Sequence, residues 1–122
     1  LQTIHELATP QTLVHANVPN ANSLHRQLAV AMGLIATAKE PSERNVHLMQ
    51  KRIFTAKEFR ALFEGCGFQV VAEGGYFLKP FTHAQMEAIQ NTIGSDALDG
   101  LYVLGRQLPD LASEIYLCAR IA

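Results

Sequence analysis

The sequence of 122 residues predicts a single α/β domain, because strand and helix patterns alternate along it. Residues 12–18 and 68–73 are apolar, β-branched runs bounded by turn residues, which is typical of strands. Apolar residues at helical spacing separate these two runs and continue after the second one. Residues 114–121 are nearly all apolar, as expected of a strand with a neighbour on each side. We therefore expect three strands and about four helices in one domain over residues 1–122.

Composition excludes several classes of partner. The net charge of −1 and the pI near 6.6 give no reason to expect nucleic acid or an anionic membrane surface. No apolar run approaches the ~18 residues of a membrane span, and no signal peptide is present, so a cytoplasmic location is expected. Cys66 and Cys118 lack CxxC spacing and predict two buried thiols rather than a metal site or a disulfide.

Charged residues make up 17% of the chain, below the roughly 25% of an average globular domain. A small domain has much surface to cover, so this low charge content indicates a face that another molecule covers. The partner expected there is either a further part of the same fold or a second copy in a homodimer.

The N-terminal third predicts a helix, a strand and a second helix. Residues 1–7 have helical spacing and end before Pro10, which removes a backbone donor. Residues 12–18 form the first strand, and the chain breaks at Pro19 before the next helix begins near Asn22. One face of that helix is expected to pack inward, through Leu24, Leu28, Ala31, Met32 and Ile35.

The middle of the chain carries a capping box, Thr55-x-x-Glu58, in which the hydroxyl and the carboxylate satisfy the first turn of a helix reciprocally. Gly65 and Gly67 are both available as its left-handed C-terminal stop. The helix is expected to bury Phe59, Leu62, Phe63 and Cys66.

The strand at 68–73 follows, and the pair Gly74-Gly75 is expected to bend or bulge it. A second capping box at 82–85 starts a helix that stops at Gly94. A short helix then runs to about Gly105, before a loop at Pro109 and the last strand.

Three landmarks together resemble the C-terminal half of a class I S-adenosylmethionine-dependent methyltransferase. They are the Val18-Pro19-Asn20 turn after a strand, the pattern His47, Phe54-Thr55 ending in Gly67-Phe68, and the closing strand. The resemblance implies that residues 12–18, 68–73 and 115–121 are strands five, six and seven of a partial Rossmann-like fold. Strand seven would then run antiparallel between the other two. The resemblance covers nearly the whole chain but only about half of the family's domain.

The segment G-G-Y-F-L-K-P-F at 74–81 resembles a bacterial subset of this family, some of which methylate saccharides or other small molecules. The glycine-rich turn and the acidic residue that hold the cofactor in the family have no counterpart in this chain. Pro10-Gln11-Thr12 also replaces the family's P-G-G turn. The cofactor, S-adenosylmethionine, is therefore expected to bind a missing N-terminal half of the domain, and the isolated chain is expected to be inactive.

On this resemblance the acceptor would lie over the carboxyl end of strand five, near residues 19–26. His25 and His47 are the candidate general bases, since imidazole titrates near neutral pH. The alternative for each is a structural or solvated histidine. Asn20 and Asn22 could orient an acceptor hydroxyl, although helix capping alone also explains them.

The remaining candidates are basic or aromatic. Arg26 and Arg52 could contact an anionic acceptor, and a solvated surface is the alternative. Tyr76, Phe77 and Lys79 could line an acceptor pocket, with core packing as the alternative for the two aromatic residues. The other three histidines, His5, His15 and His83, form no catalytic or metal-binding pattern in the sequence. No metal-ligand spacing occurs elsewhere in the sequence either.

A second hypothesis assigns a different class of function. Few charges and the open edges of a three-stranded sheet also suit a non-enzymatic α/β module that self-associates through its apolar face. The two hypotheses differ in whether a second polypeptide restores catalysis or only covers the surface.

Overall fold

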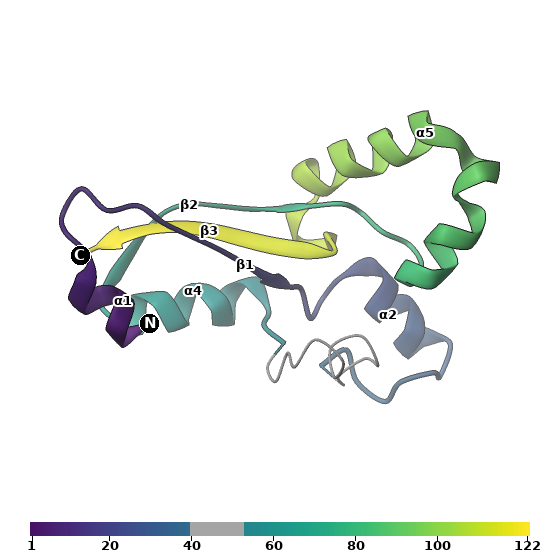
Figure 1. The fold of residues 1–122 in the computed structure, drawn as a ribbon. Helices are drawn as coiled ribbons and strands as arrows, with labels where there is room; N and C mark the ends of the chain where they lie inside the picture. Colours follow the sequence, from purple (N-terminus) through teal and green to yellow (C-terminus); the bar gives the residue numbers. More distant parts are fainter. Residues whose placement is uncertain (40–52) are drawn as a thin grey trace.

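The structure, a computed structural model shown in Figure 1, describes residues 1–39 and 53–122. Its sheet contains β1 (Val14–Pro19), β2 (Phe68–Tyr76) and β3 (Glu114–Ile121) in the order β1-β3-β2. β3 pairs antiparallel with both neighbours, so β1 and β2 run parallel to each other. The expected central place and direction of the last strand are confirmed, as is the α/β class.

The described helices are α1 (Gln2–Leu7), α2 (Leu24–Ala31), α4 (Ala56–Gly65) and α5 (His83–Gln107), with a 3-10 turn η1 (Pro109–Leu111) before β3. Figure 1 shows α4 along one side of the sheet and α5 beyond the end where β2 leaves it.

The core lies between α4 and the sheet. Thr55 accepts a hydrogen bond from Glu58 N at 3.2 Å, and the Glu58 carboxylate accepts one from Thr55 N at 3.2 Å, which confirms the first capping box. α4 ends at Gly65, and Gly67, one of the two expected left-handed stops, follows it with a φ of +87°. The buried cluster consists of Phe54, Phe59, Phe63, Phe68, Ile115, Leu117 and Ala119.

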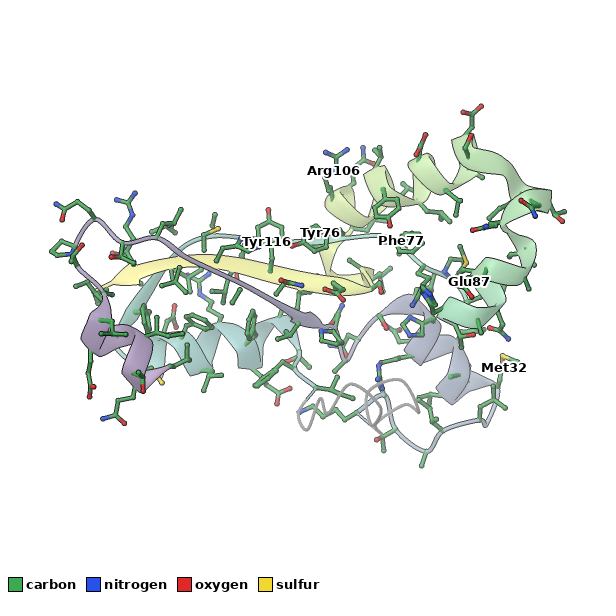
Figure 2. All side chains as sticks on the ribbon, in the orientation of Figure 1. Met32, Tyr76, Phe77, Glu87, Arg106 and Tyr116 are labelled. Atoms are coloured by element: carbon green, nitrogen blue, oxygen red, sulfur yellow. The ribbon has the colours of Figure 1, made fainter. Side chains whose placement is uncertain are left out.

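The prediction for the inner face of α2 is wrong. Leu28 is 36% exposed and Met32 is 62% exposed, whereas Arg26 is only 5% exposed. The reason is that the chain folds back beside the helix, and Arg26 donates to Ala38 O at 2.9 Å. The helix therefore turns its basic residue inward and leaves its apolar side to solvent, with Met32 at the far end in Figure 2.

The prediction that Gly74-Gly75 bends or bulges the strand is also wrong. β2 continues through Gly74-Gly75 to Tyr76, and the register shift falls between Val70 and Ala72 instead. The pair is needed for close approach: a Cβ on Gly74 would lie 2.8 Å from the Tyr116 ring. The glycine lets the ring of the central strand extend across β2.

α5 begins with the second predicted capping box and is broken at Gly94, which has φ of 78° and ψ of 167°. Two helical segments therefore meet there, as expected, and the second ends at Gln107, close to the expected end near Gly105. This second segment is attached to the end of β2, because Leu78 N donates to Leu101 O at 2.9 Å.

Candidate functional site

A pocket lies at the carboxyl end of β1, between the first turns of α2 and α4 and the η1 turn. Its volume is about 510 Å³. We call it the carboxyl-end pocket. It is lined by Asn20, Asn22, Gln27, Thr55, Ala56, Lys57, Asp110 and Leu111.

Asn20 builds the floor of the pocket. Its side chain is 2% exposed, and Nδ2 donates to Asp110 O at 3.0 Å and to Ala112 O at 2.9 Å. Its Oδ1 accepts from Asn22 N at 3.0 Å. These three bonds join the end of β1 to the η1 turn and hold the loop that leads to α2.

The wall of the pocket offers groups of three kinds. Asn22 and Gln27 carry amides, with Gln27 Nε2 donating to Asn22 O at 2.6 Å. Asp110 carries a carboxylate and Lys57 an ammonium, and both residues are exposed. Amide, carboxylate and ammonium groups around one hollow suit a small molecule that presents hydroxyls and an anionic group.

The hollow continues past this pocket. A second cavity of about 290 Å³ shares Ala56, Lys57 and Asp110 with it and extends beside α4 to Glu73 and Gly74. Arg60 forms an ion pair with Glu73 at 2.6 Å along this extension. Lys57 therefore borders both cavities.

Sequence reasoning missed Gln27, Lys57 and Asp110. Lys57 lies inside the capping box, so its sequence context indicated a helix start rather than a ligand. A usable signal was nevertheless present, because the first turn of a helix that follows a strand lies at the carboxyl edge of the sheet.

His25 lies outside the lining of this pocket and is grouped with two cations instead. Burial, together with the smaller effects of the charges of Lys79 and Arg26, lowers its pKa from the ordinary value of 6.5 to about 4. Its Nδ1 lies 3.2 Å from Ser23 Oγ. The imidazole is therefore neutral at pH 7.

We expect His25 to make the free energy of unfolding depend on pH between about 4 and 6.5. The unfolded chain binds the proton first as the pH falls, so stability decreases from pH 6.5 towards pH 4 and this contribution levels off below. Histidine signals followed by NMR should show one imidazole titrating near pH 4. In the variant His25→Asn this part of the slope should disappear, whereas His83→Asn should retain it; a titration of His25 near 6.5 would contradict the prediction.

The basic candidates are partly brought together. Arg26 is buried, and burial lowers its pKa below the ordinary value, so the alternative of a solvated surface residue is wrong. Lys79, just beyond β2, acts electrostatically on His25. The two cations Arg26 and Lys79 therefore act on the neutral imidazole of His25 at the start of α2.

The two aromatic candidates, Tyr76 and Phe77, stack on different elements of the fold. Tyr76 stacks on Tyr116 of β3, with ring centres 5.3 Å apart, whereas Phe77 stacks on Tyr102 of α5 at 4.4 Å. Figure 2 shows Tyr76 beside Tyr116 above the sheet and Phe77 towards α5. Burial, with the charge of Glu114 in second place, raises the pKa of Tyr76.

His47 and Arg52, the other base and anion-binding candidates, lie outside the described residues, and their roles stay predictions. Among residues 1–39 and 53–122, no group of three or more His, Cys, Asp or Glu side chains is placed to hold a metal ion. No helix in this described part is both long and apolar enough to cross a membrane.

Comparison with models of known protein families gives no match to this chain, and comparison with functionally characterised proteins gives none either.

Proposed function

We propose that residues 1–122 form the C-terminal, acceptor-side part of a class I S-adenosylmethionine-dependent methyltransferase that acts on a small-molecule acceptor of the saccharide type. The observation that carries this proposal is the strand order β1-β3-β2, with β3 antiparallel between two mutually parallel strands. That order supports a correspondence with strands five, seven and six of the family whose motifs the sequence resembles.

In this proposal the chain binds and orients the acceptor. Asn22, Gln27 and Asp110 hydrogen-bond acceptor hydroxyls in the carboxyl-end pocket, and Lys57 attracts an anionic substituent. Orientation is the main contribution such an enzyme makes to an in-line displacement. The departing hydroxyl proton requires a base. Because His25 lies outside the lining of this pocket, we propose the predicted His47 for this role rather than His25.

The described residues do not fit the cofactor. β1 is followed directly by Asn20 and the turn into α2, and Gly74-Gly75 lies inside β2 rather than at a strand-to-helix turn. S-adenosylmethionine would supply the methyl group when bound, and we propose that a polypeptide other than these 122 residues holds it. Free Cys66 and Cys118 support placing this activity in the reducing cytoplasm.

Calorimetry with S-adenosylhomocysteine tests the division between acceptor side and cofactor side. We expect no saturable binding to the 122 residues alone, and saturable binding once they are joined to the polypeptide that carries the cofactor side. Binding by the isolated chain would contradict our assignment of the cofactor residues. A folded, joined protein that binds no cofactor would contradict the methyltransferase proposal itself.

NMR binding of simple methyl glycosides and a nucleoside diphosphate sugar tests the pocket. We expect the side-chain amide signals of Asn22 and Gln27 to shift. Lys57→Gln or Asp110→Asn should weaken binding by about tenfold, since each removes a charge-assisted hydrogen bond. The control Asp99→Asn, on exposed α5, should leave affinity unchanged. If all three variants bound these ligands with the affinity of the wild type, this pocket would be excluded as the acceptor site.

The second candidate function, a module that self-associates, is favoured by the exposed apolar side chains. They lie on and after α2 and on the second segment of α5, and patches of this kind mark interaction sites on soluble proteins. Light scattering at high micromolar concentration should then report a homodimer, and Met32→Glu should shift it towards monomer; a monomer throughout would exclude this candidate. The exposed apolar side chains that favour this candidate are those of Leu28, Val30, Met32, Leu34, Tyr102, Val103, Leu104 and Leu108.

A further inference from the structure

The face of the sheet opposite α4 brings a thiol and an imidazole together. Cys118 of β3 alternates with buried Leu117 and Ala119, so its side chain lies on the other face from the core. His15 of β1 is its direct cross-strand partner and is exposed. This face is separate from the carboxyl-end pocket.

The two side chains are in contact. His15 Nδ1 lies 3.3 Å from Cys118 Sγ, which is hydrogen-bond distance for sulfur. The imidazole is held in place by stacking on Tyr116, with ring centres 5.7 Å apart and planes inclined by 24°. Tyr116 in turn stacks on Tyr76, so three rings cross all three strands.

We propose that Cys118, with His15 as its base, is a reactive thiol that exchanges with low-molecular-weight disulfides carrying carboxylates, of which oxidised glutathione is the test case. His15 accepts the thiol proton at Nδ1, and the thiolate is the nucleophile. Tyr76 is protonated at neutral pH, because its pKa is raised above the ordinary value of 10.0. Tyr76 therefore does not compete with His15 for the thiol proton.

The exchange step is balanced without a further oxidant. Cys118 Sγ attacks one sulfur of the disulfide, a new S–S bond forms and the old S–S bond breaks. The leaving thiolate takes up the proton that His15 accepted. Cys118 is oxidised in the mixed disulfide, and the released thiol is the reduced product.

Charge favours an anionic disulfide. Arg120 lies two residues beyond Cys118 on β3, on the same face of the sheet, and is exposed. The carboxylate of Glu114 lies on this face four residues before Cys118, and it accepts a hydrogen bond from Asn17 Nδ2 at 2.7 Å. A disulfide that carries carboxylates is therefore attracted at the Arg120 side of the thiol.

The chain contains its own control. Cys66 is also a free, partly exposed thiol, but it packs against the phenylalanine-rich core cluster at the end of α4. In the part of the chain that the structure describes, the imidazole–thiol hydrogen bond is found at Cys118 and not at Cys66. His5 lines one pocket with Cys66, so comparing the two cysteines tests the imidazole–thiol hydrogen bond rather than the mere presence of a histidine nearby.

The test treats the whole 122-residue chain with oxidised glutathione and follows each cysteine by peptide mass spectrometry. We expect Cys118 to form the mixed disulfide at least about tenfold faster than Cys66, and dithiothreitol to reverse it. The variant His15→Phe, which keeps a ring against Tyr116, should slow Cys118 by about tenfold and leave Cys66 unchanged. His15→Asn is the second variant, in case the larger ring perturbs the strand.

A neutral disulfide, bis(2-hydroxyethyl) disulfide, separates recognition from reactivity. Arg120→Gln should slow the reaction of Cys118 with glutathione disulfide by severalfold and leave the neutral reaction unchanged. The proposal is overturned if Cys66 reacts as fast as Cys118, or if both His15 variants react at the wild-type rate. An equal effect of Arg120→Gln on both disulfides would overturn the preference for carboxylates.

Discussion

Replacing Phe63 by alanine is expected to lower the free energy of unfolding by about 3–5 kcal/mol, one of the largest losses available to a single substitution here. Phe63 is 2% exposed and lies between the rings of Phe59 and Phe68, at 5.4 and 5.5 Å between centres. Truncation would remove contacts with both rings and leave a cavity between α4 and the sheet. Urea denaturation followed by circular dichroism measures the loss.

Two variants serve as controls for this prediction. Phe63→Leu keeps most of the volume and should cost less than about 1.5 kcal/mol. Phe81→Ala removes a ring that is 40% exposed and should change stability little. If Phe63→Ala is no less stable than Phe81→Ala, the packing of α4 on the sheet described here is incorrect.

The elements that sequence predicted best are those specified by short-range chemistry. Thr55 and Glu58 are three residues apart, as are Thr82 and Gln85, and both pairs form reciprocal capping bonds in the structure. Such bonds depend on neighbours in the chain, so their residue types alone indicate where a helix begins. The apolar run at 114–121 likewise predicted the central strand, because both of its edges are paired.

The features that sequence missed depend on distant segments. His15 and Cys118 are separated by 103 residues and meet only because β1 and β3 pair in one register. Asp110 enters the carboxyl-end pocket because its own backbone carbonyl accepts a bond from Asn20. The burial of Arg26 follows from the return of the chain at Ala38. Periodicity carries no information on contacts of this kind.

Gly105→Ala is expected to destabilise the fold by about 3 kcal/mol, because overpacking against main chain cannot be relieved by a side-chain rotation. A Cβ on Gly105 would lie 2.2 Å from Phe77 N and 2.7 Å from the carbonyl carbon of Tyr76. The second segment of α5 would have to move away from the end of β2. That movement would disrupt the Phe77–Tyr102 stack and the bond from Leu78 N to Leu101 O.

Gly100→Ala is the matched control, since Gly100 lies in the same helical segment and a Cβ there would meet nothing within 4 Å. Alanine at this exposed helical position should stabilise the fold by about 0.5–1 kcal/mol, because glycine loses more backbone entropy on folding. Opposite signs in two Gly→Ala variants, measured in the same urea series, can only arise from the contact that Gly105 makes with β2. If both variants were stabilised equally, the second segment of α5 would not pack against the end of β2.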